Sequence, residues 1–400
     1  MEPLHAQTVV LASPATKIRL SLLSTAMVDA LGGPAEFADR FSFPTISSMI
    51  PNKTFGLPPG VWTDDTSMAL CLAHSLSTSK LDSNQPSPQG AGGFDEHDQM
   101  AAYTSWRRNG FLSAIGRCFD VGNTVSGTIS LYSRCDPQVA FERIKEAYED
   151  ESYSGNGSLM RVIPIGLAYW PDEQKAREYA RRSSVTTHPN EMCQEACEVW
   201  TGVISMIMKA ACSSSDERSK LSKLRVLEYF AKFPYKVPKL RDALSLPSTA
   251  PETPEAEDEK ERHYRSYHPI MKLVTETESL FSHRQNKLKP HAPTGKQLPS
   301  SGYVLHTLVA ALYSFLATST FEEGAIFAVN LGDDADTVGA VYGGLAGCWY
   351  AHEQAALPQG ASLFWSKRVE DWKNTLVERE MVEQVAEKLV SFSARLVAEQ

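Results

Sequence analysis

The chain has 400 residues, of which 42% are hydrophobic and 22% charged. It can therefore bury a sizeable core, and it is neither collagen-like nor disordered throughout. The formal net charge is −9 and no basic block stands out in the sequence, which argues against general nucleic-acid binding and against binding to anionic membranes. The most apolar stretch, 303–317, is too short to span a bilayer.

Hydrophobic residues recur with a period of about 3.6 along most of the chain, which predicts helices. In chain order these fall at 18–31, 95–108, 137–148, 172–182, 191–209, 303–317, 337–350 and 367–399. Alternating strand patterns are missing, and no β-α-β alternation is present to build a parallel sheet. The sequence therefore predicts an all-α orthogonal helical bundle.

Two low-complexity segments interrupt this pattern. Residues 77–93 are rich in Ser, Pro and Gly and predict a flexible surface loop. Residues 246–301 contain seven prolines and a charge run at 252–262, so we expect a largely disordered insertion around one short helix near 270–282. This insertion could instead be a hinge between domains. Because motifs on both of its sides make chemical sense only together, we interpret 1–400 as a single domain.

The seven cysteines are odd in number and form no CxxC pair. This usage is typical of a reduced compartment, so we expect a cytoplasmic or nuclear protein whose cysteines serve mostly as small core residues. The first residues also lack the basic and apolar regions of a secretory signal. We expect the protein to be a monomer.

Three acidic clusters touch the ends of apolar helices: residues 29–36 (DALGGPAE), 62–66 (WTDDT) and 332–337 (GDDADT). A bare carboxylate there is costly unless it is hydrogen-bonded or bound to a cation. Each aspartate taken singly could be a helix cap. Taken together, oxygen-only side chains suit a hard cation such as Mg²⁺, with Mn²⁺ as an alternative, and argue against zinc or copper.

The spacing of these residues constrains their placement. Asp334 and Asp336 would point about 200° apart on a helix, so we expect both in the turn before a helix that starts near Thr337. By the same argument, residues 63–65 should precede the helix that carries the apolar segment 68–72. Pro34 stops the first helix, which leaves Glu36 just past its end and able to turn back.

A stripe of glycines recurs every four residues after the third cluster, at Gly339, Gly343 and Gly347. Each costs roughly 1 kcal/mol in helix propensity, so another helix backbone should press closely against the stripe. The segment 18–31 is the expected partner.

A fourth motif, Gly155 to Arg161 (GNGSLMR), places a glycine-rich loop before a helix expected to open near Leu159. Such a loop suits a diphosphate, although it is often only a turn. Arg161 could pair with phosphate or with an acidic neighbour. His188 could contact a substrate or simply pack in the core, and Asp120 could receive a leaving group or cap a turn.

These ordered motifs resemble those of the ADP-ribosylglycohydrolase family, which includes ADP-ribosyl-acceptor hydrolases and the dinitrogenase-reductase-activating glycohydrolase. The resemblance spans about residues 16–210 and 303–355, although 331–333 read Leu-Gly-Asp where many members carry paired glycines. It implies an all-α fold. It also implies hydrolysis of the bond between C1″ of the distal ribose of ADP-ribose and a protein side chain or another conjugate.

The resemblance also implies roles for individual residues. Two Mg²⁺ ions would be held by Thr63, Asp64, Asp65, Asp334, Asp336 and Thr337. The catalytic carboxylate would be one of Glu36, Asp64 and Asp65. Substrate contacts would come from Asp120, Gly122, Asn123, Gly155, Asn156, Gly157, Ser158, Met160, Arg161 and His188.

The implied partner is an ADP-ribosylated protein or ADP-ribose conjugate. Two other functions fit the same residues: a non-catalytic ADP-ribose-binding module that kept the scaffold, and a metal-dependent phosphohydrolase that uses paired aspartates.

Overall fold

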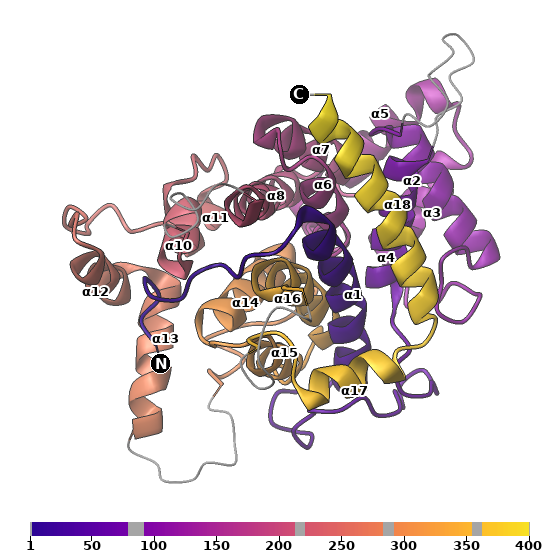
Figure 1. The fold of residues 1–400 in the computed structure, drawn as a ribbon. Helices are drawn as coiled ribbons and strands as arrows, with labels where there is room; N and C mark the ends of the chain where they lie inside the picture. Colours follow the sequence, from indigo (N-terminus) through magenta and orange to yellow (C-terminus); the bar gives the residue numbers. More distant parts are fainter. Residues whose placement is uncertain (1, 79–91, 213–220, 283–291, 354–361, 400) are drawn as a thin grey trace.

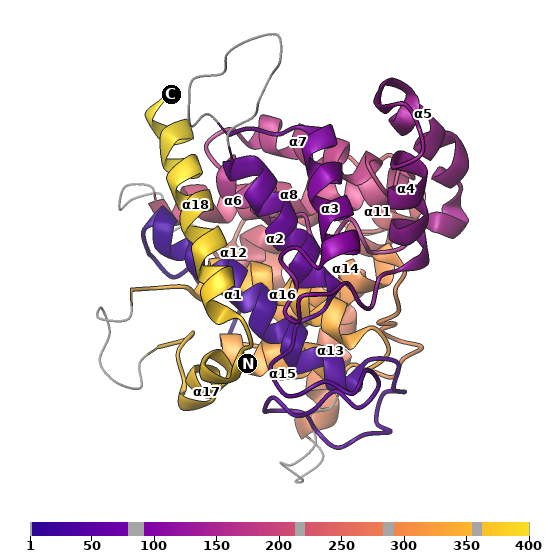
Figure 2. The same ribbon diagram turned by 90° about the vertical axis from the view of Figure 1, so that its right-hand side faces the viewer.

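A computed structural model describes residues 2–78, 92–212, 221–282, 292–353 and 362–399. Helices make up most of this part of the chain, and its β pairing is limited to three isolated bridges. Figures 1 and 2 show helices from distant parts of the sequence gathered around α1 and α16. The predicted all-α bundle is confirmed.

The contact between α1 (Pro14–Gly32) and α16 (Ala335–Tyr350) forms the centre of the fold. A Cβ atom added to Gly343 would lie 2.5 Å from the carbonyl oxygen of Ser24, and one added to Gly339 would lie 2.8 Å from that of Val28. The two backbones can approach this closely only because the glycines carry no side chain. The expected partnership between the glycine stripe and the first helix is confirmed.

Other helices surround this central pair. Directly against it lie α2 (Asp64–Ser77), α6 (Ile163–Ala168), α8 (Glu191–Cys212), α14 (Val304–Leu316), α15 (Phe321–Val329) and α18 (Arg379–Ala398). A second layer contains α3 (Glu96–Asn109), α4 (Asn123–Tyr132), α5 (Pro137–Tyr148) and α7 (Glu173–Val185). The remaining helices of the described residues are α10 (Lys223–Lys232), α11 (Pro238–Leu244), α12 (Glu257–Tyr267), α13 (Pro269–Ser282) and α17 (Lys367–Thr375). Two short 3₁₀ turns span Gly33–Ala35 and Glu151–Tyr153.

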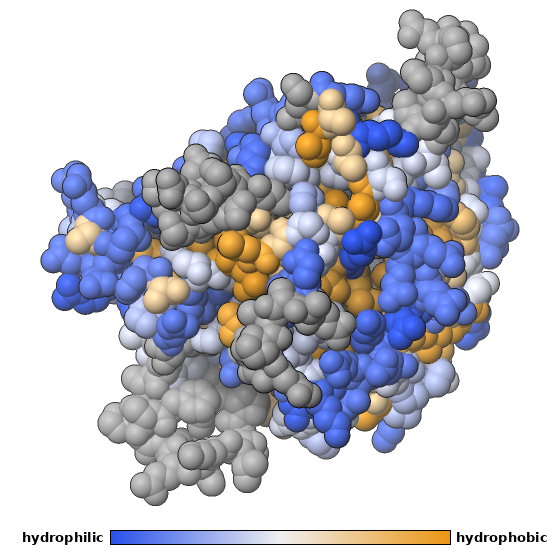
Figure 3. Space-filling view, viewed as in Figure 1, coloured by the Kyte–Doolittle hydropathy of each residue, from blue (hydrophilic) through white to orange (hydrophobic). Residues whose placement is uncertain are grey.

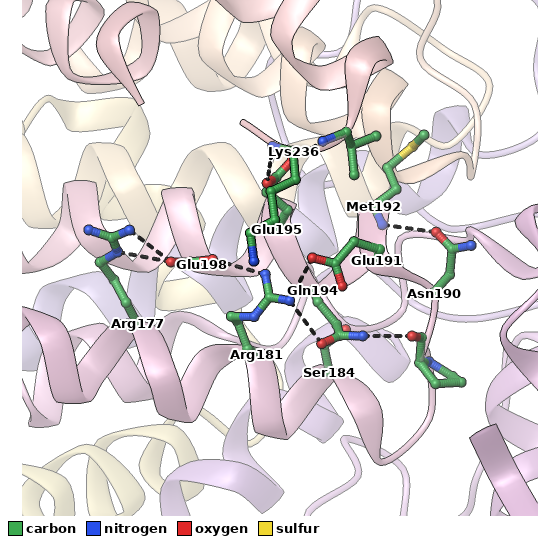
Figure 4. Close-up of polar contacts among 12 residues, drawn as sticks. Arg177, Arg181, Ser184, Asn190, Glu191, Met192, Gln194, Glu195, Glu198 and Lys236 are labelled. Atoms are coloured by element: carbon green, nitrogen blue, oxygen red, sulfur yellow. Dashed lines mark hydrogen bonds and ion pairs between the residues drawn. The ribbon is translucent and has the colours of Figure 1, made fainter. Parts of the chain in front are cut away.

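Arginine–carboxylate pairs join neighbouring helices in the outer layer. Figure 4 shows Arg177 and Arg181 of α7 donating to the carboxylate of Glu198 on α8, at 2.8 and 3.0 Å. Arg181 also reaches Glu191, at the start of α8, at 2.7 Å. The charges of these two arginines are thus neutralised by acidic side chains of the helix on which α7 packs.

The second low-complexity segment is more ordered than we expect from composition. Its charge run lies largely in α12, which is followed directly by α13, so over its described residues the expectation of a largely disordered insertion is wrong. Ion pairs between Glu257 and Lys260 and between Glu261 and Arg265 support α12, and Tyr264 is fully buried. Residues 79–91 of the predicted loop and 283–291 of this segment lie outside the described residues.

Four helix boundaries differ from the predicted ones. The predicted helix 367–399 is divided into α17 and α18, because Glu378 adopts a left-handed conformation (φ 52°). Helices α2 and α16 begin at Asp64 and Ala335, earlier than expected, since aspartates are favoured at helix N-termini with free N–H groups. In contrast, α6 begins only at Ile163, after a turn.

The face of the molecule in Figure 3 is mainly hydrophilic over its outer helices, and hydrophobic residues gather near its centre. No described helix combines the length and the apolar character needed to cross a membrane. The six described cysteines are free thiols.

Candidate active site

The ends of three central helices bring the acidic clusters together. Glu36 follows the last turn after α1, Asp64 and Asp65 lie in the first turn of α2, and Asp336 lies in the first turn of α16. Close backbone contact fixes this arrangement, since a Cβ atom added to Gly32 would lie 2.6 Å from the carbonyl oxygen of the first residue of α16. The acidic residues therefore meet at one point of the core.

Asp29 of α1 positions the second acidic cluster through hydrogen bonds. One of its carboxylate oxygens accepts a hydrogen bond from the hydroxyl of Thr66 at 2.6 Å, and the other accepts from the backbone N–H of Thr63 at 3.0 Å. The hydroxyl of Thr63 lies 3.0 Å from both Asp29 and Asp65. Sequence reasoning placed Asp29 in the first motif but gave it no role. Asp29 could have been singled out from the sequence, because it is the one carboxylate inside an apolar helix.

Several carboxylate oxygens of the cluster are buried without a protein partner. These are Oε2 of Glu36, Oδ1 of Asp65 and Oδ1 of Asp336, among the described side chains. Oxygen atoms of Asp29, Asp65 and Asp336 all lie within 4.8 Å of one another, and so do those of Glu36, Asp120 and Asp336. Buried oxygens that converge without donors are what a hard cation requires.

Asp334 is held by residues from other motifs. Its Oδ2 atom accepts a hydrogen bond from the side-chain amide of Asn156 at 2.7 Å. The hydroxyl of Thr337 lies 3.3 Å from Oδ2 of Asp65, which connects the third acidic cluster to the second. The residues expected to hold metal are thus linked to one another.

Arg40 fixes the loop that carries Asp334, a role that the sequence did not signal. Its guanidinium donates to the carbonyl oxygens of Leu331 and Leu298, at 2.7 and 2.6 Å, and to the carbonyl oxygen of Pro293. The backbone of residues 37–38 also pairs with that of Asp333. The chain after Glu36 and the loop of the third acidic cluster therefore form one unit.

Burial raises the pKa of the carboxyl groups in the cluster, and repulsion between neighbouring carboxylates adds to this effect. The pKa of Asp29 rises to about 6, that of Asp120 to about 7 and that of Glu36 to about 10. The pKa values of Asp65 and Asp336 lie well above their usual range for the same reasons. In the absence of a cation, several of these groups would hold protons at neutral pH.

The protein supplies little positive charge to this cluster. The N-termini of α2 and α16 each offer roughly half a positive charge, against seven carboxyl groups that line the surrounding pocket. No lysine or arginine is present among the described residues that line it. The donor set and its unpartnered oxygens thus fit divalent cations.

The pocket has a volume of about 450 Å³ and is lined by most of the residues expected to contact substrate. These are Asp120, Gly122, Asn123, Gly155, Asn156, Gly157, Met160 and His188. Of the expected metal ligands, Asp64, Asp65, Asp334, Asp336 and Thr337 line it as well. All four motifs therefore contribute to one cavity.

Three expected residues lie behind the pocket wall. Thr63 faces Asp29 and Asp65, and Ser158 is buried with its hydroxyl 2.9 Å from that of Ser184. Arg161 is fully buried and donates to the carbonyl oxygen of Gly157, so it has neither the phosphate nor the acidic partner considered above. The turn over 157–161 before α6 directs these side chains into the core, and the expected helix N-terminus is therefore absent from this loop.

His188 lies in the pocket wall in a neutral form. Its Nδ1 atom is 2.9 Å from the hydroxyl of Thr187, and its Nε2 atom is 3.5 Å from the position that a Cβ on Gly155 would take. Burial and the charge of Arg161 lower its pKa to about 3. It can therefore position a ligand by contact or by hydrogen bonding, without adding positive charge.

A family model for ADP-ribosylglycohydrolases matches residues 11–396. This chain therefore belongs to the ADP-ribosylglycohydrolase family. The acidic cluster lies within the matched range, where the four sequence motifs described above converge.

Relatives and a solved structure agree with this membership. ADP-ribosylarginine hydrolase Tri1 of Serratia proteamaculans is 26% identical over 374 residues, which cover 93% of this chain and 78% of the relative. ADP-ribosylhydrolase ARH3 of Homo sapiens is 21% identical over 342 residues, with coverages of 82% and 79%. A solved structure named ADP-ribosylglycohydrolase-related protein complex shares 30% identity and a TM-score of 0.58, covering 95% of this chain and 99% of its own.

Proposed function

We propose that this protein removes ADP-ribose from modified proteins or related conjugates by hydrolysing the glycosidic bond at C1″ of the distal ribose. The observation that carries this proposal is the set of buried, unpartnered carboxylate oxygens of Glu36, Asp65 and Asp336 inside a pocket of about 450 Å³. Family membership and the names of the relatives, which include an ADP-ribosylarginine hydrolase and ADP-ribosylhydrolases, support the same reaction.

We propose Mg²⁺ as the cofactor, in a two-ion site, with Mn²⁺ as an alternative. Asp64, Asp65, Asp334, Asp336 and Thr337 are the residues that would hold the ions. Bound divalent cations would supply Lewis-acid contacts to substrate oxygens and lower the pKa of water. They would also offset the charge that otherwise repels the diphosphate of ADP-ribose from an anionic pocket.

The chain itself can manage the proton of the reaction. Glu36 and Asp120 are hydrogen-bonded to each other, and burial keeps the pKa of both carboxyl groups high. Two close carboxyl groups with raised pKa values share a proton at neutral pH, so one can donate while the other accepts. Glycoside hydrolysis needs such paired acid and base functions around an oxocarbenium-like transition state.

A substrate panel tests this function. Serine-linked and arginine-linked ADP-ribosylated proteins are incubated with the protein, with Mg²⁺ or with a chelator, and free ADP-ribose is measured. We expect Mg²⁺-dependent release from at least one linkage, which would identify the acceptor. Binding of ADP-ribose without turnover would instead favour the non-catalytic binding module. Release of phosphate from nucleotides without free ADP-ribose would favour the phosphohydrolase.

Variants separate catalysis from folding. Asp65→Asn and Asp336→Asn should abolish release of ADP-ribose while the helical circular dichroism signal remains. Asp39→Asn is the matched control, because Asp39 is exposed and no side-chain hydrogen bond or ion pair holds it within the described residues. Full activity in both cluster variants would defeat the proposal.

A further inference from the structure

A group of arginines lies near the pocket, at the far end of α4. Arg107 and Arg108 lie in the last turn of α3, Arg134 follows α4, and these three border a groove of about 310 Å³, here called the arginine groove. Arg117 is nearby, because a Cβ atom added to Gly110 at the end of α3 would lie 2.4 Å from its backbone nitrogen. The cluster is spread over the sequence and forms no basic block there.

The charges of the arginine groove are not neutralised within the described chain. In the outer layer, Arg177 and Arg181 share Glu198, and arginines on other helix surfaces are paired in similar ways. Among the described residues, none of the three arginines of the groove forms an ion pair. Residues 99–135 contain four arginines, no lysine and a single acidic residue, Asp120, in a chain of net charge −9.

The groove contains a guanidinium that is already held in place. Arg107 is half-buried and donates to the backbone carbonyl of Ser126 and, at 2.6 Å, to the hydroxyl of Ser130. A guanidinium carries five N–H donors in a planar fork, so further donors are left for a ligand in the groove. Because it is already ordered, it would lose little side-chain entropy when an anion binds.

Helix α4 connects the groove to the pocket. Asn123 and Thr124 at its start line the pocket, whereas Ile129 and Ser130 line the groove. Asn123 and Ser130 are seven residues apart, which places them on the same face of the helix and about 10 Å from each other. A polypeptide whose modified side chain enters the pocket can therefore follow α4 into the groove.

We propose that the arginine groove binds the carboxylate side chains of an acidic segment next to the ADP-ribosylated residue of a protein substrate. This inference rests on the proposed function. The anionic pocket and the net charge of −9 repel acidic segments, and the groove locally reverses that field. Because an extended chain advances about 3.3 Å per residue, acidic residues roughly three to five positions from the modified one would reach it.

Binding of an unmodified peptide tests the groove without any need for turnover. The probe is a fluorescent peptide of alternating Glu and Ser, followed by anisotropy at low salt, with a Gln-Ser peptide as the neutral comparison. Arg108→Gln combined with Arg134→Gln should weaken binding of the acidic peptide by about threefold to tenfold. Both side chains are exposed and no ion pair of theirs is lost, so the double variant should fold.

The matched control removes the same two charges elsewhere. Arg143→Gln combined with Arg262→Gln changes exposed arginines on α5 and α12 that pair with Glu146 and Glu259. This control should bind the acidic peptide as the wild type does. Equal loss in both double variants, or no loss in either, would overturn the proposal, because binding would then not depend on the groove.

A hydrolysis assay provides the second test of the arginine groove. Two peptides carry the same ADP-ribosylated residue, one flanked by Glu and one by Gln. The wild type should show the lower KM for the Glu-flanked peptide, and the groove variant should lose this difference. If the variant instead weakens binding of free ADP-ribose, the groove serves the nucleotide and the proposal fails. If neither peptide is hydrolysed, the proposed function fails, while the anisotropy result still decides the groove.

Discussion

The side-chain amide of Asn156 donates a hydrogen bond to Asp334 at 2.7 Å and connects two motifs that are 178 residues apart. The same nitrogen donates to Thr307 at 2.8 Å, on the first turn of α14. The position of the Asp334 carboxylate is therefore set by a loop and a helix outside its own motif. This arrangement gives Asn156 a positioning role beside its place in the pocket wall.

Replacing Asn156 tests that role. In Asn156→Leu, Asp334 loses its donor, and hydrogen bonds to charged groups contribute about 1.5–3 kcal/mol. We expect kcat/KM for ADP-ribose release to fall by about 10-fold to 100-fold, with an unchanged helical signal. Asn109→Leu, at an exposed position at the end of α3, is the comparison and should keep its activity. Wild-type activity in Asn156→Leu would show that the contact is dispensable.

The raised pKa values predict an unusual dependence of stability on pH. A carboxyl group whose pKa is higher in the folded chain than its unfolded value of about 4 binds protons preferentially when folded. The stability that it contributes is present below about pH 4 and is lost as the pH rises through the folded pKa. For Asp29, Asp120 and Glu36 these folded pKa values are about 6, 7 and 10.

In chelator, the melting temperature should therefore fall steadily between about pH 5 and pH 9. Added Mg²⁺ should raise it most at the alkaline end, because cations and protons compete for the same oxygens. Differential scanning fluorimetry at several pH values, with chelator or with Mg²⁺, measures both effects. A melting temperature in chelator that is flat over this range would contradict the unneutralised cluster.

Arg40 should matter for stability and for activity. Arg40→Met removes hydrogen bonds to three carbonyl oxygens of the loops around Asp334, at a cost of about 2–4 kcal/mol in the free energy of unfolding. Arg40→Lys retains the charge without the planar fork of the guanidinium. Its free energy of unfolding should therefore lie between those of Arg40→Met and the wild type. Urea unfolding measures the free energy of unfolding of each variant. Arg19→Met, which breaks an exposed pair with Glu387, should cost less than about 1 kcal/mol.

The contact between α1 and α16 leaves no room for a methyl group. In Gly343→Ala, the new Cβ would collide with the backbone carbonyl of Ser24, and such overpacking costs about 1–3 kcal/mol or more. Because α16 also carries Asp336 of the acidic cluster, activity should fall with stability. Gly295→Ala is the matched control, since nothing lies within 4 Å of its added Cβ. An unfolding free energy of Gly343→Ala equal to the wild type would refute this account.

The parts of the fold and site that could be predicted are those with a local signal. The glycines of α16 revealed its close helix partner, and the acidic residues at helix ends indicated that the three clusters meet in one pocket. Arg40 gave no such signal, because its partners are three carbonyl oxygens and the hydroxyl of Ser300, all in loops more than 250 residues away along the chain. Arg161 and Ser158 belong to a recognisable motif, yet a single turn directs them into the core, and motif membership alone does not show which side chains reach the pocket.

The contact between Asp65 and Thr337 joins residues 272 positions apart. During synthesis, a nascent chain that has already emerged through α8 still lacks the helix that completes the acidic cluster and covers α1. Closing so large a loop is entropically costly and slow, so the acidic cluster is completed late in folding, after nearly the whole chain has left the ribosome. Truncated translation products would consequently expose the apolar surface of α1 and become substrates for chaperones before they could act as enzymes.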